Sequence, residues 1–476
     1  MKSGMKQLRI VLLGIMISNI LLSQEKIDKE LLKKDLDVLK ANLEAYHTGL
    51  YTYTSKEEFD QWYLETKKQL EDTTPLGFYK KITELNTLIK NGHTFFHINP
   101  EQRGKNVLMP PITIYKDQER FYIKSILNSE KPEIIGKQII AINAIPIGDI
   151  FTTLLRYEER DGENLTQPTE ELLYSFARKF ALEYGNHSKT HLDIKDQQIS
   201  KKVIISNIPF EKVTNKTDAL NDNGGAKFVI KDTVGIVTVE TFREEPLKRD
   251  KYRASLKTFF KKIKNQQIKH LIIDVRNNGG GDSESVEELI SYLYDKPFTY
   301  YKDVYQQHKK WDSSIIPEVS SYPKNMSSWT LKKGADGYYR AFIGVDGMSN
   351  NKPKKDTYKE NLYILINGST LSAAAEFASF IKNYRKATFI GDEAGGNKVQ
   401  NTSGYSLIIG LPNSKIIAAI PIILWKMNVE FKNDGHGVIP DYSVSNTIED
   451  EINSRDGVME FTLDLIRKTK GRHPSK

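Results

Sequence analysis

The feature that most constrains the fold is a regular alternation of strand-like and helix-like segments after residue 227. The apolar runs GIVTVETF, HLIIDVR, LYILIN and ATFIGDE alternate with segments of helical periodicity such as RASLKTFFKKIKNQ, SVEELISYLYD and AAAEFASFIKN. Strands joined by helices need crossover connections, which place neighbouring strands parallel and cover the sheet with helices. The pattern therefore predicts an α/β layered core with largely parallel strands.

The chain before this core has a helical part and a β-rich part. Residues 26–90 repeat apolar side chains at intervals of three and four, which is typical of amphipathic helices. Thr74 and Pro75 form a helix-start signal, and Gly92 is expected to end the last of these helices. From 105 to 210, short alternating runs such as RFYIKSI and KQIIAIN predict strands, with one inserted helix.

The first 23 residues have the composition of a secretory signal peptide. The basic segment MKSGMKQLR precedes the apolar run IVLLGIMISNILL, which is too short for a comfortable membrane span. We expect cleavage near Ser23–Gln24 and export to the periplasm or the medium, with no stable membrane span afterwards. The chain has no cysteine, so disulfides, thiol catalysis, thiolate metal ligands and lipid attachment at a cysteine are excluded. Cleavage would leave a net charge of about +5, spread along the chain, which gives little support to nucleic-acid binding.

Two connecting stretches complete the predicted organisation. DALNDNGGAKFV (218–229) resembles a linker, and the insertion at 296–356 is predicted to be a long loop or flap over one face of the core. The predicted boundaries are a signal peptide at 1–23, a helical domain at 24–100, a β-rich domain at 101–225 and the α/β core at 226–470.

Two segments that follow strands carry residues suited to catalysis. The run LIIDVRNNGGGDS ends in three consecutive glycines, Gly279 to Gly281, which can adopt positive φ and direct N–H groups at a ligand, although a tight turn is the structural alternative. In TLSAAAEFA, Ser372 is followed by small side chains that would leave room for a substrate. The N–H of Ala373, at the start of a helix, could pair with one from the glycine turn to form an oxyanion hole. The structural alternative for Ser372 is a helix N-cap.

A serine nucleophile also needs a proton acceptor. Of the nine histidines, His93 in NGHTFFHI and His436 in NDGHGVIPD lie in the contexts that best suit this role, and each also has a structural interpretation. His93 and His97 are four residues apart, but the intervening TFF resembles a strand and no H-E-x-x-H motif is present. We therefore expect no metal site and no cofactor.

Four motifs, taken in order, resemble peptidase family S41, the tail-specific or C-terminal-processing proteases and their tricorn-like relatives. They are IIDVRNNGGG (272–281), NGSTLSAAAEFA (367–378), TFIGDEAGGN (388–397) and GHGVIPDYSV (435–444). The segment KNGHTFF (90–96) is similar to the histidine motif of the tricorn-like branch, to which the chain is therefore closer. The resemblance implies a crotonase-like (ClpP/crotonase) α/β core that hydrolyses polypeptides through a serine acyl-enzyme.

The resemblance also implies roles for residues near the two strand ends. Ser372 falls on the nucleophile, and Gly279, Gly280 and Ala373 fall on the oxyanion hole. The family often has an acidic residue at the position of Ala375, where this chain has its glutamate one residue later.

The base and the acid depend on the branch of the family. The tricorn-like branch implies His93 as the base and an acidic residue before G-V-x-P-D, where Asp434 aligns most directly and Glu430 is the alternative. In the processing-protease branch the base is a lysine 25 residues after the serine, a position that Asn397 occupies here. Lys398, one residue later, is the alternative base.

The middle of the chain contains a segment, IIGKQIIAINAIPIGDI, that resembles part of a PDZ domain. The predicted fold is therefore α/β, with a crotonase-like core, an N-terminal helical segment and a β-rich, PDZ-like middle domain. The leading functional hypothesis is an exported serine endopeptidase. The alternatives are a catalytically inactive protein that binds peptides or apolar ligands on the same scaffold, and an esterase.

Overall fold

The computed structural model describes residues 25–103, 107–127, 131–210, 225–243, 246–309, 319–320, 330–345 and 347–470. The predicted signal peptide at 1–23 and most of the predicted linker at 218–229 lie outside these residues. Within the described parts of the chain, no helix is long and apolar enough to cross a membrane.

Residues 26–90 are helical, as the periodicity predicted, but they form four helices where the pattern indicated three, because the segment after Pro75 divides at Thr83. The helices are α1 (Lys29–Tyr46), α2 (Lys56–Gln69), α3 (Pro75–Ile82) and α4 (Glu84–Ile89). The predicted start of α3 is confirmed, because the Thr74 side chain accepts the N–H of Gly77 and Pro75 is the first helical residue. The predicted stop at Gly92 is wrong. The helix α4 ends at Ile89, and Lys90 takes the left-handed conformation (φ 53°) that closes it.

The β-rich middle region is an antiparallel sheet with strand order β3-β4-β5-β7-β8, and β6 pairs with β5. Two helices pack against it, where the sequence pattern predicted one, and a further short strand pair and a 3₁₀ turn complete the region. The elements are α5 (Pro100–Arg103), β2 (Leu108–Met109), β3 (Ile112–Asp117), β4 (Arg120–Ile126), η1 (Pro132–Ile134), β5 (Gln138–Ile142), β6 (Ile145–Pro146), α6 (Ile147–Leu155), α7 (Thr166–Tyr184), β7 (Lys189–Asp196), β8 (Ile199–Ser206) and β9 (Ile208–Pro209).

The core is a six-stranded sheet in the order β10-β11-β12-β17-β18-β23. Only the β10–β11 pair is antiparallel, so the predicted α/β core with largely parallel strands is confirmed. The strands are β10 (Ala226–Lys231), β11 (Val234–Val239), β12 (His270–Asp274), β17 (Asn361–Ile366), β18 (Thr388–Gly391) and β23 (Tyr442–Ser443).

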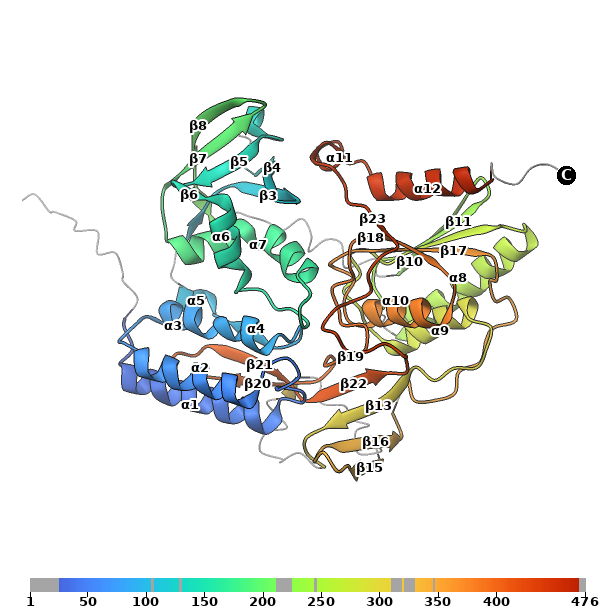
Figure 1. Ribbon diagram of the computed structural model, residues 1–476, viewed down its shortest axis with the longest axis horizontal. Helices are drawn as coiled ribbons and strands as arrows, with labels where there is room; N and C mark the ends of the chain where they lie inside the picture. Colours follow the sequence, from blue (N-terminus) through green and yellow to red (C-terminus); the bar gives the residue numbers. More distant parts are fainter. Residues whose placement is uncertain are drawn as a thin grey trace, which may run out of the picture.

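Helices cover both faces of this sheet. Figure 1 shows α8 (Pro246–Asn265), α9 (Ser283–Leu293) and α10 (Ala373–Tyr384) on one side, and α12 (Gly457–Lys470), which follows α11 (Ile448–Ile452), on the other. Successive residues of β12 separate accordingly: Ile273 joins the main core, and Ile272 joins a smaller cluster with Val458 and Ile466 of α12. All are buried, because a parallel sheet needs apolar side chains on both faces.

Two further sheets connect the N-terminal helices to the core. Their strand orders are β1-β21-β20-β14 and β15-β16-β13-β22-β19. Residues 296–356 therefore contain strands in place of the long loop that was predicted. The strands are β1 (Phe95–His97), β13 (Tyr301–Gln306), β14 (Val319–Ser320), β15 (Thr330–Lys333), β16 (Tyr339–Ile343), β19 (Gln400–Asn401), β20 (Ser406–Gly410), β21 (Ile417–Pro421) and β22 (Ile423–Met427).

The pairing of β1 with β21 has a direct consequence for the site. Phe95, Phe96 and His97 lie opposite residues 417–419, more than three hundred positions later in the chain. The loop that carries His93 immediately precedes β1, so this pairing fixes its position against the C-terminal half of the protein.

Candidate active site

The candidate catalytic segments meet at one edge of the core sheet. The parallel strands β12, β17 and β18 end at Asp274, Ile366 and Gly391, and the loops that follow carry the glycine turn, Ser372 and the segment 392–397. The carboxyl ends of parallel strands lie along the same edge, and ligands of open α/β sheets bind there.

Ser372 occupies the N-cap position of α10 but does not cap the helix. Among the described residues its side chain makes no capping hydrogen bond, and its backbone lies at φ 49° and ψ −126°. This conformation is costly for a residue other than glycine, and it is typical of a serine held on a sharp strand-to-helix turn with its hydroxyl presented outward. The N-cap alternative for Ser372 is therefore wrong.

The sequence suggested that the alanines after Ser372 leave open space for a substrate, but the structure shows no such space at these residues. Ala373, Ala374 and Ala375 are all buried. Their small size serves close packing, since a Cβ on Gly396 would lie 2.7 Å from the Cβ of Ala375. Within residues 370–378, Leu371 and Ser372 are partly exposed, and the residues that follow them are buried.

The glycine turn lies directly against the serine. Gly280 has φ 100°, and a Cβ at this position would lie 2.7 Å from Ser372 Cβ and 2.9 Å from the Ala373 nitrogen. The backbone N–H of Leu371 donates to the Asn278 carbonyl at 3.0 Å and fastens the two loops together. Only glycine fits where the two backbones approach so closely.

The expected oxyanion donors differ in availability. The N–H of Gly280 already donates to Asn278 Oδ1 at 2.9 Å, so it holds the turn in shape. Ala373 is the first residue of α10 and has no intrahelical acceptor for its N–H. Within the described residues, the N–H of Gly279 also meets no hydrogen-bond acceptor. Gly279 and Ala373 are thus the two predicted donors that remain free.

His93 lies in a loop that is fastened from several sides. The side-chain oxygen of Asn91 accepts hydrogen bonds from the His93 N–H, the Thr94 hydroxyl and the Thr402 hydroxyl, each at 3.1 Å. Thr94 also contacts His47 Nε2 at 2.8 Å. His93 Nδ1 is buried and has no hydrogen-bond partner among the described residues.

Asn401, at the end of β19, connects this loop to the serine. Its Nδ2 donates to Ser372 Oγ at 3.2 Å and to Glu376 Oε1 at 2.9 Å. The next residue, Thr402, is the one that donates to Asn91. Two adjacent residues therefore contact the candidate nucleophile and the histidine loop, although Ser372 and His93 share no hydrogen bond in the part of the chain that is described.

The Glu376 carboxylate accepts a hydrogen bond from Asn401 and is itself held by two tyrosines. The hydroxyls of Tyr300 and Tyr301 both donate to Glu376 Oε2 at 2.9 Å. Burial raises the pKa of the Glu376 carboxyl, while the hydrogen bonds from Asn401 and the two tyrosines oppose the rise. A buried carboxyl with three donors fixes the orientation of the Asn401 amide.

The motifs around this site also match a known family. The family model for peptidase family S41 matches residues 233–444. The chain carries a peptidase family S41 domain. Members of this family are serine proteases, so the match supports serine-protease chemistry for the chain and a polypeptide substrate.

The fold as a whole resembles that of CPAF. A CPAF point mutant matches with a TM-score of 0.66 and 14% identity, over 94% of this chain and 99% of that chain. Mature CPAF matches with a TM-score of 0.63 and 15% identity over 92% and 97% of the two chains, and mature CPAF complexed with lactacystin with 0.63 and 15% over 93% and 98%. At such low identity these likenesses show a shared fold.

The two acids that the sequence predicted for the site, Asp434 and Glu430, have other described partners. Both oxygens of Asp434 contact Lys398 Nζ at 2.7 Å, and the Asp434 side chain is 54% exposed. Burial acts to raise the pKa of Asp434, but the contact with Lys398 opposes it, and this pKa lies below its usual range. The ammonium group of Lys398 is therefore held in an ion pair. The N–H of Glu430 donates to Asn383, near the C-terminal end of α10. The structure does not bring these three side chains to Ser372 in any described contact.

The described partner of the His436 ring is also a residue other than Ser372. Its Nδ1 lies 3.1 Å from Glu393 Oε1, which also accepts the N–H of Gly437 at 2.8 Å. Of the two predicted histidines, His93 is the one whose loop the described contacts connect to Ser372, through its backbone N–H, Asn91 and the Asn401–Thr402 segment.

Sequence reasoning missed two residues of this site, Asn401 and Asp161. Asn401 lies 29 positions after Ser372 in a two-residue strand, and Asp161 lies in the loop between α6 and α7, in the segment RDGEN. Asp161 accepts the N–H of Gly92 at 2.8 Å and is buried. The Asp-Gly pair signals a turn, but no local pattern connects it with a histidine about seventy residues earlier.

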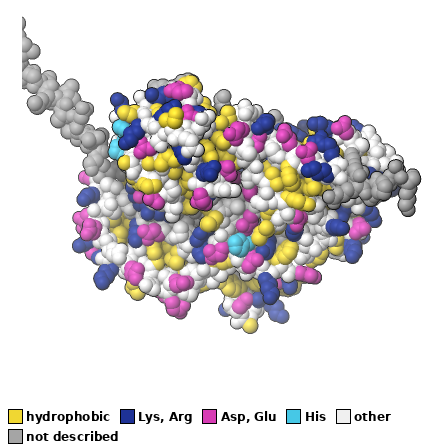
Figure 2. Space-filling model, turned by 45° about the horizontal axis from the view of Figure 1, so that its top comes forward, with side chains coloured by type: hydrophobic (Ala, Val, Ile, Leu, Met, Phe, Trp, Pro, Cys, Tyr) yellow, Lys and Arg dark blue, Asp and Glu magenta, His cyan; other side chains and the backbone are white. Residues whose placement is uncertain are grey.

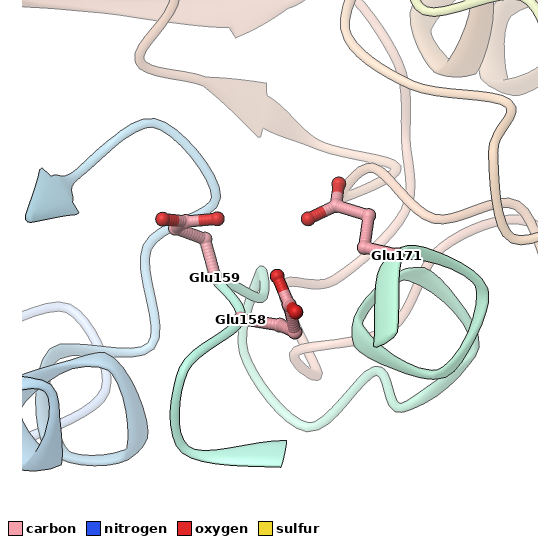
Figure 3. Close-up of side chains that lie close together, drawn as sticks. All are labelled: Glu158, Glu159 and Glu171. Carbon is pink, nitrogen blue, oxygen red and sulfur yellow. The ribbon is translucent and has the colours of Figure 1, made fainter. Parts of the chain in front are cut away.

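Three carboxyls also lie together beyond the S41 domain, in the middle region. The ligand oxygens of Glu158, Glu159 and Glu171 lie within 4.8 Å of one another (Figure 3). Burial and mutual repulsion raise the pKa of Glu159 to about 8, and burial raises that of Glu171 to about 7. Glu158 accepts the Ser175 hydroxyl at 2.6 Å and lies 3.7 Å from Lys179. Protonation and these partners account for the cluster, and we assign no ligand to it.

Proposed function

We propose that this chain is an exported serine endopeptidase of the S41 type. The observation that carries the proposal is the backbone of Ser372, which lies at φ 49° with a hydroxyl that does not cap α10, beside two free N–H groups. A residue in such a sparsely populated conformation is stabilised by its surroundings at an energetic cost, and such residues cluster at functional sites.

In the proposed reaction the Ser372 hydroxyl attacks the carbonyl carbon of a peptide bond. His93 accepts the hydroxyl proton and later donates it to the leaving amine, and the N–H groups of Gly279 and Ala373 stabilise the oxyanion. Water then attacks the acyl-enzyme and releases the second product. The positive end of α10 lies at Ala373 and favours the developing negative charge.

A substitution at Ser372 tests the proposal. Ser372→Ala should abolish hydrolysis of an unstructured polypeptide such as casein, and labelling by a fluorophosphonate probe, because the attacking oxygen is gone. Ser369→Ala, three positions earlier in the same loop, is the matched control and should keep both activities. Labelling or hydrolysis that survives in Ser372→Ala would contradict the assignment.

One observation favours a second candidate, a binding protein on the same scaffold without catalysis. Ser372 Oγ contacts Asn401 in this structure and makes no described hydrogen bond to His93. Such a protein would bind a peptide or apolar ligand and would not react with the fluorophosphonate. An esterase would react with the probe and hydrolyse esters but not casein.

The finer fold and localisation are part of the same proposal. The parallel sheet β11-β12-β17-β18, with a helix after each of β11, β12 and β17, supports a crotonase-like core. The antiparallel middle region, with α6 directly after β6, supports a PDZ-like domain. Residues 1–23 carry the composition of a signal peptide, so the N-terminus of the mature protein should be Gln24 by N-terminal sequencing, in the periplasm or the medium.

A further inference from the structure

A catalytic histidine needs a group that orients its ring and stabilises the imidazolium that forms during acyl transfer. Both oxygens of Asp434, the acid that motif alignment favours, contact Lys398, and Glu430 lies near the end of α10. The buried Nδ1 of His93 has no partner among the described residues. Among the described residues, His93 Nδ1 therefore has no hydrogen bond to either of the acids that the motif alignment indicates.

Asp161 is a buried carboxylate beside the histidine loop. Its Oδ1 accepts the N–H of Gly92, the residue before His93, at 2.8 Å. A Cβ on Gly92 would lie 3.1 Å from the Asp161 carboxyl carbon and Oδ2, so glycine is the residue that lets the carboxylate approach the loop. The Asp161 side chain is therefore in van der Waals contact with the backbone that carries the histidine.

The same carboxylate faces the serine side of the site. Its Oδ2 makes a long contact of 3.5 Å with the N–H of Asn397. The preceding residue, Gly396, lies so close to the nucleophile that a Cβ there would be 3.3 Å from the Ser372 nitrogen. Asp161 thus touches the loop that carries His93 and the loop that packs against Ser372.

The charges around His93 favour Asp161 as its electrostatic partner. Burial lowers the pKa of His93, and the negative charge of Asp161 opposes this effect. Burial also lowers the pKa of His47, which approaches the loop from the end of α1, to about 4, so His47 is neutral at pH 7. Other charged groups in the adjoining loops form ion pairs: Lys398 with Asp434, and Lys90 with Glu163.

We propose that Asp161 is the positioning residue of His93: it holds the histidine loop in place and stabilises the imidazolium while Ser372 is acylated. The inference rests on the proposed function for the roles of Ser372 and His93. In the acylation step the proton of the Ser372 hydroxyl moves to the His93 ring, and the charge that appears on the ring lies beside the Asp161 carboxylate.

The substitution Asp161→Asn tests this role and keeps the shape of the side chain. Because the amide oxygen can still accept the Gly92 N–H, a purely structural role would survive the change. We expect kcat/KM for casein to fall by about 10²–10⁴, with the acid limb of its pH profile displaced to lower pH, since loss of the anion disfavours the imidazolium. Glu163→Gln is the matched control: this exposed carboxylate lies in the same loop and pairs with Lys90, so its loss should leave the profile unchanged.

A second measurement does not depend on turnover. The His93 ring can be titrated by NMR in the Ser372→Ala background, with and without Asp161→Asn, and assigned with His93→Gln. We expect a lower pKa of His93 in the Asp161→Asn protein and the same pKa in the Glu163→Gln protein. If Asp161→Asn fails to fold, Asp161→Glu keeps the charge and should keep both the pKa and the pH profile.

The outcomes separate the two proposals. An unchanged His93 pKa and pH profile in Asp161→Asn would overturn the role of Asp161, as would a displacement in Asp434→Asn instead. A wild-type protein that neither hydrolyses casein nor reacts with the fluorophosphonate would overturn the proposed function, while the NMR titration would still decide whether Asp161 acts on His93.

Discussion

Ser372 is a serine at the start of a helix whose hydroxyl contacts a side chain from another sheet. The strained backbone (φ 49°) turns the hydroxyl away from the N–H groups of α10, and the Asn401 amide approaches it at 3.2 Å. Sequence motifs identified Ser372, because residue type and order along the chain are local information. They could not identify Asn401, because its approach depends on the packing of β19 against β22.

Substitution of Asn401 should impair the candidate site without removing the proposed nucleophile. Asn401→Ala leaves Ser372 Oγ without its described donor and removes one of three donors to Glu376. We expect the kcat for casein to fall by roughly 10- to 100-fold, and the free energy of unfolding by about 1–3 kcal/mol, the usual cost of an unsatisfied buried group. Steady-state kinetics and urea denaturation would measure the two effects.

The neighbouring residue supplies the control for Asn401. Gln400→Ala alters the same two-residue strand, where the described hydrogen bond of Gln400 to Asn397 comes from its backbone. Gln400→Ala should change neither the kcat for casein nor the free energy of unfolding. Equal effects of the two substitutions would mean that the strand, and not the Asn401 amide, supports Ser372.

At the scale of elements, the site depends on turns that follow parallel strands and on a connecting segment from the middle region. Residues 161–166 contact both halves of the site: Gly162 N–H donates to the Lys90 carbonyl at 2.9 Å, and Asn164 Nδ2 donates to the Ala394 carbonyl at 2.7 Å. The strands and helices were predictable from periodicity. The connecting segment was not, because its contacts join residues that lie far apart in the sequence.

The glycine turn offers a matched pair of substitutions. Gly280→Ala places a Cβ 2.7 Å from Ser372 Cβ at a positive φ, whereas a Cβ on Gly279 meets no atom within 4 Å. We expect Gly280→Ala to lower the free energy of unfolding by roughly 1–3 kcal/mol and to abolish fluorophosphonate labelling, because the serine must move.

Gly279→Ala should change the stability much less, within about 1 kcal/mol. Denaturation of both variants, followed by circular dichroism, measures the difference. Equal stabilities would show that the turn can move away from Ser372 at little cost.

At the scale of the whole molecule, the candidate active site lies where segments from distant parts of the described chain converge. The histidine loop precedes β1, which pairs with β21, while the serine follows β17 in the central sheet. Figure 1 shows the N-terminal helices, the middle region and the core arranged around this junction. On the face drawn in Figure 2, basic and acidic side chains are interspersed, which agrees with the spread of charge along the sequence.

The carboxyl cluster in the middle region predicts a pH dependence of global stability. The pKa of Glu159 in the folded protein is about 8, above its ordinary value of 4.5, because of burial and then of repulsion from Glu171 and Glu158. The folded protein therefore binds an extra proton between these values, and the free energy of unfolding falls as the pH rises through this window.

Glu159→Gln removes the titrating group without changing its shape. It should raise the free energy of unfolding at pH 9 by roughly 1–3 kcal/mol relative to the wild type, and have little effect at pH 5, where Glu159 is already protonated. Urea denaturation at the two pH values measures this, with the exposed Glu133→Gln as control. A gain of equal size at both pH values would contradict the raised pKa.

The sequence by itself determined the alternation of strands and helices, the parallel core, the helical N-terminal region and the position of Ser372 after a buried strand. These features depend on local periodicity and on motifs within a few residues. Only the tertiary structure decided that the alanines after Ser372 are buried and that the Gly280 N–H donates to Asn278. It also decided that Asp161 and Asn401 approach the site. These contacts depend on the register between segments that are distant in the chain, and hydrophobic periodicity does not specify that register.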